Sequence, residues 1–285
     1  MKPYQAMREH DLRGDKHLGQ HILVDPHAVR EIVDGADLDA GDLVLEVGPG
    51  PGTLTAQLAE LAAEVIAVEL DERMLVPLRE ALAGHDNVRV VRGDILEQDV
   101  AELVGQRPYK VVANLPYYIT SAVLRHLLSA PLRPDCLVVT VQREVADRIV
   151  GRPGRRQRHK QEQRMSLLAV SVQFYGQPRI LARIPAGAFR PIPSVDSAVV
   201  RIDTYDPLPW GVVDEALFFE VARAGFAQSR KQLRNALRLG LPYADEETDE
   251  ALARSGIDPR RRAETLSVAE WVALSNAFAA LRQDG

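Results

Sequence analysis

Residues 43–52 read LVLEVGPGPG, an apolar run that leads into three alternating glycines. Four of the first five side chains are apolar, which is typical of a buried strand. Glycine accepts left-handed backbone and lets a ligand approach the chain, so the segment predicts a strand, a tight turn and a binding loop. Residues 53–62 then carry apolar side chains at helical spacing, which predicts a helix.

The alternation of strands and helices continues through the first half of the chain. Expected strands lie at 65–68, 88–91, 110–113 and 136–141, and expected helices at 72–82 and 121–129. Such alternation predicts an α/β fold with a parallel, doubly wound sheet, in which ligands bind at the carboxyl ends of the strands.

The pattern changes after Tyr205, where the prolines of 206–209 are typical of a linker. Helices alone are expected beyond it, at 214–225, 229–239, 245–255 and 267–282. Ser267 and Glu270 have the spacing of a capping box at the start of the last helix. We therefore predict two domains, an α/β domain at 1–205 and a small all-α domain at 206–285.

Composition narrows the class of protein. The 285-residue chain is 46% hydrophobic and 26% charged, as in ordinary globular proteins. Its single cysteine, Cys136, excludes a disulfide framework and a Cys-rich zinc site, and we expect no metal. No apolar run approaches the roughly 18 residues of a membrane span, and residues 1–16 lack the apolar core of a signal peptide. We expect a cytoplasmic protein with no membrane partner.

Charge is unevenly distributed along the chain. Positions 1–110 carry 11 basic and 21 acidic residues, whereas positions 111–285 carry 24 and 19. Between residues 143 and 240 the balance is 17 basic to 9 acidic. This excess favours a nucleic-acid-binding surface, although a solvated helix face is the alternative. The candidate RNA-binding residues are Arg223, Arg230, Lys231, Arg234 and Arg238.

The glycine spacing limits the identity of the ligand. A dinucleotide fingerprint needs a glycine where Thr53 stands, and a P-loop needs a Gly-Lys-Ser/Thr run that is absent. Glu69 ends the next strand, where an acid typically accepts hydrogen bonds from a ribose. Asp94 follows the third strand, where it could accept from an adenine amine. A glycine loop with two such acids and no phosphate grip predicts S-adenosylmethionine as the cofactor.

Residues 114–117, Asn-Leu-Pro-Tyr, follow the fourth strand. An exocyclic amine delocalises its lone pair into the ring, and acceptors on its N–H groups favour the pyramidal nitrogen that can take a methyl group. The side-chain oxygen of Asn114 and the carbonyl of Leu115 could supply two acceptors, and Tyr117 could stack on the base. The motif predicts methylation of a nucleic-acid amine, with a simple Asn-Pro turn as the alternative.

Six stretches together resemble the small-subunit ribosomal RNA adenine-N6,N6-dimethyltransferase family, nearly end to end. They are 16–23 (KHLGQHIL), 46–52 (EVGPGPG), 114–120 (NLPYYIT), 141–146 (VQREVA), 188–197 (AFRPIPSVDS) and 261–267 (RRAETLS). The resemblance implies a Rossmann-like class I S-adenosylmethionine-dependent methyltransferase sheet with a C-terminal helical RNA-recognition domain.

The resemblance also implies a role for individual residues. The catalytic residues would be Asn114, Leu115, Pro116, Tyr117 and Phe189, the last of which would sandwich a flipped adenine. The cofactor-binding residues would be Gln20, His21, Leu23, Gly48, Gly50, Glu69, Asp94 and Asn114. His21 stands where the family commonly has Asn, and Ser229 begins a run that is usually Arg-Arg-Lys. The basic stretch 152–164 is longer than the usual loop and would contact phosphate or be solvated.

The implied reaction transfers methyl groups to N6 of two adjacent adenines near the 3′ end of small-subunit rRNA. The implied enzyme is a monomer that acts on a pre-30S particle. Three alternatives stay open: the related large-subunit rRNA methyltransferase of macrolide resistance, a ribosome-assembly factor whose catalysis is dispensable, and a nicotinamide oxidoreductase. Residues 142–145 and 261–267 favour the small-subunit enzyme, and Thr53 disfavours the oxidoreductase.

Overall fold

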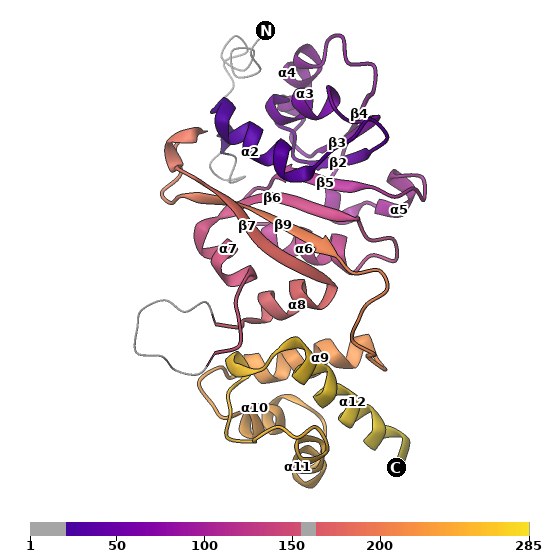
Figure 1. Ribbon diagram of the computed structural model, residues 1–285, viewed down its shortest axis with the longest axis vertical. Coiled ribbons are helices and arrows are strands. Elements are labelled where there is room, and N and C mark those ends of the chain that lie inside the picture. The colour runs from indigo at the N-terminus through magenta and orange to yellow at the C-terminus, as the bar shows by residue number, and fades with distance from the viewer. Residues whose placement is uncertain (1–20, 155–163, 285) are drawn as a thin grey trace. The chain divides into compact units, whose positions relative to one another are not determined.

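A computed structural model of the protein describes residues 21–154 and 164–284 (Figure 1). Its elements, in chain order, are β1 (Ile22–Leu23), α2 (Pro26–Ala36), β2 (Leu43–Val47), α3 (Thr53–Ala59), β3 (Glu64–Glu69), η1 (Glu72–Met74), α4 (Leu75–Ala81), β4 (Val88–Arg92), η2 (Ile95–Glu97), α5 (Val100–Leu103), β5 (Lys110–Asn114), α6 (Thr120–Leu128), β6 (Cys136–Gln142), α7 (Arg143–Ile149), α8 (Leu167–Tyr175), β7 (Gly176–Ile184), η3 (Ala186–Ala188), β8 (Phe189–Arg190), β9 (Ser197–Thr204), α9 (Glu215–Ala227), α10 (Leu233–Gly240), α11 (Asp245–Arg254), η4 (Ala263–Thr265) and α12 (Val268–Asp284).

A seven-stranded sheet runs in the order β4-β3-β2-β5-β6-β9-β7. Strands β4, β3, β2, β5 and β6 pair in parallel, and β9 pairs antiparallel with β6. The five expected strands and the α/β class are therefore confirmed. The sequence analysis missed β7 and β9, because both follow α8 without the strand–helix alternation on which the prediction relied.

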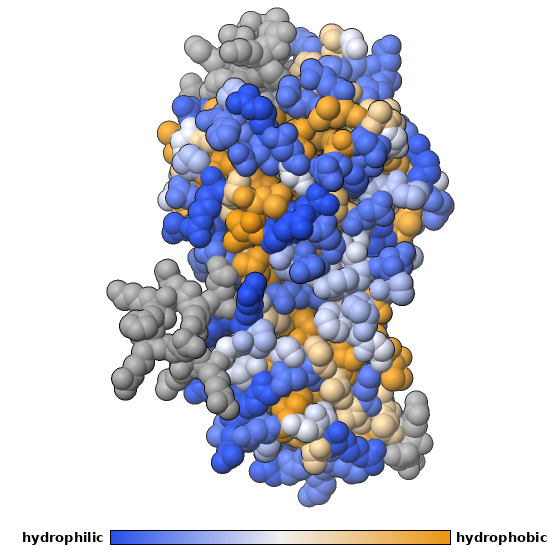
Figure 2. Space-filling view, in the orientation of Figure 1, coloured by the Kyte–Doolittle hydropathy of each residue, from blue (hydrophilic) through white to orange (hydrophobic). Residues whose placement is uncertain are grey.

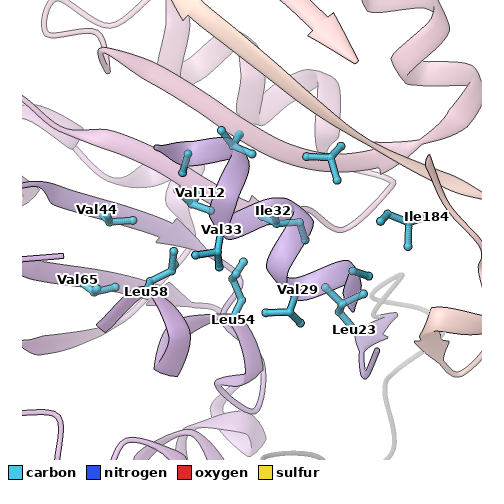
Figure 3. Close-up of a cluster of buried hydrophobic side chains, with 14 of the residues drawn as sticks. Leu23, Val29, Ile32, Val33, Val44, Leu54, Leu58, Val65, Val112 and Ile184 are labelled. Carbon is cyan, nitrogen blue, oxygen red and sulfur yellow. The ribbon is translucent and has the colours of Figure 1, made fainter. Parts of the chain in front are cut away.

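Helix α2, which the sequence analysis also missed, covers part of the sheet. It begins where the Asp25 carboxylate accepts the backbone amides of His27 and Ala28, with Pro26 in the first turn. Its apolar face packs on β5, β6 and β9 and on α3. Figure 3 shows side chains of α2 and α3 gathered with valines of the strands in one buried cluster. This cluster supports β2, whose carboxyl end carries the glycine turn.

The chain divides into two compact units. One contains residues 1–146 and 177–204, and the other contains residues 147–176 and 205–285. The chain passes from the first unit to the second for the last time between residues 204 and 205. The domain boundary expected after residue 205 lies next to this position. The structure adds that residues 147–176, which the sequence analysis assigned to the first domain, cluster with the C-terminal helices.

The second unit is helical in its described part. Phe174 of α8 stacks on Phe218 of α9, with ring centroids 4.3 Å apart. The capping box before α12 is present, because the Glu270 carboxylate accepts the Ser267 amide at 2.8 Å and the Ser267 hydroxyl accepts the Glu270 amide at 3.3 Å. The expected helix at 229–239 begins later, at Leu233, where its first amides donate to the carbonyls of residues 259 and 261.

The helices that the structure describes are short or polar in comparison with a membrane-spanning helix. No helix within residues 21–154 and 164–284 has the length and apolarity needed to cross a bilayer. On the face in Figure 2, hydrophilic residues predominate and hydrophobic residues form separate patches between them.

Gly225 of α9 tests the packing of the second unit. A Cβ at this position would overlap the buried Trp271 ring and lie 3.3 Å from Leu233 Cδ1. We expect Gly225→Ala to lower the free energy of unfolding, because overpacking costs about 1–3 kcal/mol and exceeds the gain of about 1 kcal/mol in helix propensity. Gly187→Ala is the matched control, since its Cβ would enter open space. Urea unfolding of both variants measures the difference, and equal stabilities would contradict this packing.

Candidate active site

The turn after β2 is built from glycines in left-handed conformations. Gly48, Gly50 and Gly52 have φ angles of 69°, 56° and 87°. The Gly48 amide donates to the Val68 carbonyl at 2.9 Å, which fixes the turn to the neighbouring strand. The Cβ direction of Gly50 meets no atom within 4 Å. The turn therefore exposes backbone that a ligand could approach closely, as the sequence predicted.

Glu69 ends β3 and is 4% exposed. Its two carboxylate oxygens accept the backbone amides of Gly50 and Asp71, each at 2.8 Å. Burial raises the pKa of Glu69, and these two hydrogen bonds act in the opposite direction. The carboxylate is held in place by backbone on both sides, so it can present its remaining lone pairs to a hydroxyl group.

Glu46 is a second buried acid, which the sequence analysis did not select. It lies in β2, is 1% exposed, and its Oε2 has no hydrogen-bond partner among the described residues. Burial raises the pKa of Glu46 to about 8, and the nearby charge of Glu69 also raises it. The signal in the sequence was an acid inside an otherwise apolar strand. A buried oxygen without a partner fits a cationic group of a ligand.

A pocket opens at this edge of the sheet. It contains about 670 Å³ of space between atoms, its open mouth included. Nine of the predicted site residues line it together with Glu46. They are His21, Leu23, Gly48, Gly50, Glu69, Asn114, Leu115, Pro116 and Tyr117.

A second pocket shares Gly48, Glu69 and Pro116 with the first, so the two are adjacent. Asp94 lines it, and its carboxylate accepts the Leu96 amide at 2.9 Å at the start of η2. The exposed side chains of Leu70 and Tyr118 form apolar parts of its wall. The two acids predicted to hold an adenosine, Glu69 and Asp94, therefore both line this second pocket.

The Asn-Leu-Pro-Tyr motif begins at the last residue of β5. The Asn114 side-chain amide donates to the His21 carbonyl at 2.9 Å, which leaves its Oδ1 as the acceptor on the other side of the amide. The Tyr117 hydroxyl lies 2.7 Å from the Ser197 hydroxyl, and burial raises the pKa of Tyr117. The motif is thus held by side-chain contacts to two distant parts of the chain.

One predicted active-site residue, Phe189, lines neither pocket. Phe189 is fully buried in the hydrophobic cluster of α2 and α3, where it pairs with Leu23 between β8 and β1. The expected sandwich of Tyr117 and Phe189 is therefore not formed in this structure, because the Phe189 ring fills the core. Gln20 lies outside the described residues, as do residues 155–163 of the basic stretch.

The five predicted RNA-binding residues fall into two groups. Arg234 binds both carboxylate oxygens of Asp249, and Arg238 binds Asp245 at 2.7 Å and Asp249 at 2.8 Å. The Arg234 guanidinium lowers the pKa of Asp249. The other three are exposed and form no ion pair with the described residues: Arg223, Arg230 and Lys231. Nothing in the sequence pattern indicated that carboxylates of α11 would pair with two of these five cations.

Comparisons with known proteins agree on one family. The family model described as ribosomal RNA adenine dimethylase matches residues 12–280. A protein of Dehalococcoides mccartyi named ribosomal RNA small subunit methyltransferase A is 46% identical over 268 residues, which is 94% of this chain and 89% of that protein. A protein of the same name from Moorella thermoacetica is 44% identical and covers 95% of both chains.

Solved structures have the same fold. A dimethyladenosine transferase from Plasmodium falciparum superposes with a TM-score of 0.75 at 23% identity, over 91% of this chain and 98% of that one. The 23S rRNA methyltransferase ErmE superposes with a TM-score of 0.68 at 26% identity, over 90% of this chain and 99% of that one.

The unpartnered Glu46 oxygen makes a testable prediction about ligand binding. Near neutral pH this carboxyl group holds a proton, because its pKa is about 8. A cationic ligand group favours the charged form, so binding of S-adenosylmethionine should release a proton and strengthen as the pH rises from 6 to 7. Calorimetry in two buffers of different ionisation enthalpy measures this proton. The Glu46→Gln variant should release none, and an unchanged proton count in that variant would contradict the assignment.

Proposed function

The chain belongs to the ribosomal RNA adenine dimethylase family, an S-adenosylmethionine-dependent class of rRNA methyltransferase, and we propose how its residues carry out this reaction. The observation that carries the proposal is the anchored amide of Asn114, which leaves an acceptor oxygen in the pocket that also contains Glu69. The substrate we infer is a pair of adjacent adenines in the 3′-terminal hairpin of small-subunit rRNA.

The donor set of the pocket fits the cofactor. Glu69 would hold the ribose hydroxyls, Asp94 the adenine amine and the Gly48–Gly50 turn the methionine part. The unpartnered Glu46 oxygen would face the ammonium group. When bound, S-adenosylmethionine supplies an electrophilic methyl group on a sulfonium. Methyl transfer neutralises that sulfonium, so positioning should contribute more to the rate than charge stabilisation.

The Asn-Leu-Pro-Tyr motif would hold the target base. Asn114 Oδ1 and the Leu115 carbonyl would accept the two N–H groups of adenine N6 and aim its lone pair, while Tyr117 stacks on the base. The nitrogen that gains a methyl group becomes acidic and loses a proton to water. No general base is therefore required for either methylation, and none is assigned.

The small-subunit rRNA is favoured over the large-subunit rRNA as the substrate. Eight relatives named small subunit methyltransferase A are 38–46% identical to this chain, whereas the 23S rRNA methyltransferase ErmE is 26% identical. The proposal places the enzyme in the cytoplasm as a monomer that acts on a pre-30S particle.

The exposed cations of the second unit would bind the RNA backbone. Arg223, Arg230 and Lys231 have no carboxylate partner among the described residues, so phosphates could neutralise them without breaking an ion pair. Arg234 and Arg238 would instead stabilise the α10–α11 pair, because Asp249 already bridges them.

Replacing Asn114 tests the catalytic role. Asn114→Ala should lower kcat by about 10²–10³-fold, the typical effect of removing one group that stabilises a transition state. Mass spectrometry of small-subunit rRNA after incubation with labelled S-adenosylmethionine measures dimethyladenine, and isolated 50S particles serve as the specificity control. Particle binding should persist in the variant. Dimethylation at the wild-type rate in Asn114→Ala would overturn this role.

Salt dependence tests the division of the basic residues. The double variant Arg230→Gln/Lys231→Gln should bind rRNA more weakly and reduce the slope of log K against log salt by about 1.5, since each neutralised phosphate contact contributes about 0.7–0.9. Arg79→Gln is the control, an exposed arginine of the first unit. Filter binding at several salt concentrations measures the slopes. Equal slopes for the double variant and the wild type would exclude these two cations as contacts.

A further inference from the structure

His21 touches both ends of the catalytic motif. Its backbone carbonyl accepts the side-chain amide of Asn114 at 2.9 Å. Its ring stacks on Tyr117, with centroids 5.2 Å apart and planes at 28°. Among the described residues, no other contacts both Asn114 and Tyr117 in these two ways. The sequence analysis assigned His21 to the cofactor alone.

The His21 ring is itself held in place. Its Nδ1 lies 2.8 Å from the Pro191 carbonyl, a contact that requires the hydrogen of the ring to be on Nδ1. The next residue, Ile22, pairs with Arg190 between β1 and β8. Backbone pairing and the ring hydrogen bond thus fix His21 to the same segment, residues 190–191, from two directions.

Tyr117 is consequently constrained at two points. Its hydroxyl meets the fully buried Ser197 at 2.7 Å, and one face of its ring meets His21. A base needs about 3.5 Å on each side to stack between two rings, or roughly 7 Å in all. The observed 5.2 Å leaves no room for a base between His21 and Tyr117. A target adenine must then use the opposite face of Tyr117.

We propose that His21 is a positioning residue for methyl transfer, which orients Asn114 through its carbonyl and backs the Tyr117 ring through its imidazole. This inference rests on the proposed function of the motif. The ring that packs on Tyr117 is that of His21, whereas Phe189 is buried in the core.

The ring and the carbonyl can be separated by substitution. His21→Ala keeps the backbone carbonyl and removes the ring, and His21→Phe restores a flat ring without the Nδ1 donor. We expect His21→Ala to lower kcat by about tenfold to a hundredfold, as loss of alignment does, and His21→Phe to recover most of it. The dissociation constant for S-adenosylmethionine should change by less than about threefold in both. His27→Ala, an exposed histidine on α2, is the matched control.

A double-mutant cycle shows whether His21 acts through Tyr117. In a Tyr117→Ala background, His21→Ala should cause little further loss of kcat, because the ring it supports is gone. Fluorescence of 2-aminopurine at the target position should report weaker stacking in His21→Ala than in the wild type. Additive losses, or a cofactor dissociation constant that rises in step with the loss of kcat, would overturn the proposal and return His21 to the cofactor site.

Failure of the proposed function is distinguishable from failure of this inference. If wild-type protein forms no dimethyladenine in rRNA, the function itself is wrong. If the wild type is active and His21→Ala retains its full kcat with an unchanged melting temperature, the positioning role alone is wrong.

Discussion

The buried carboxylate of Glu69 ties the turn after β2 to the end of β3, and the pocket is organised around this tie. Parallel pairing brings Val47 beside Val68, so Glu69 reaches the Gly50 amide from the adjacent strand. That geometry is available because left-handed glycines turn the amide toward the carboxylate. Asp94 follows β4 and Asn114 ends β5, so consecutive strands β4-β3-β2-β5 deliver the site to one edge of the sheet.

Sequence patterns predicted those parts of the fold and site that depend on local chemistry. Buried parallel strands are continuous apolar runs, and the alternating glycines indicate a left-handed turn. Both features could therefore be recognised from the sequence. The burial of Phe189 could not be predicted from the sequence, because it depends on pairing with Leu23, which lies far earlier in the chain. The ion pair of Arg234 with Asp249 likewise depends on how α10 meets α11.

The distribution of charge has a more specific meaning in the structure than in the sequence. The basic excess of residues 143–240 suggested one continuous cationic face. Two of its arginines instead form ion pairs with carboxylates of α11, a helix that lies beyond residues 143–240. Of the five candidate RNA-binding residues, three are exposed and have no carboxylate partner among the described residues, namely Arg223, Arg230 and Lys231. An arginine count is therefore a poor measure of phosphate affinity where a neighbouring helix is acidic.

The two compact units share the polypeptide in an interleaved order. Strands β7 and β9 of the first unit are separated from β6 by residues 147–176, which belong to the second. During synthesis on the ribosome, α8 must emerge before the sheet can be completed and long before α9 exists to cover Phe174. A gene fragment that stops after residue 205 would thus encode the complete sheet together with α8, which would lack the helices that cover it. Neither unit corresponds to one continuous stretch of the gene.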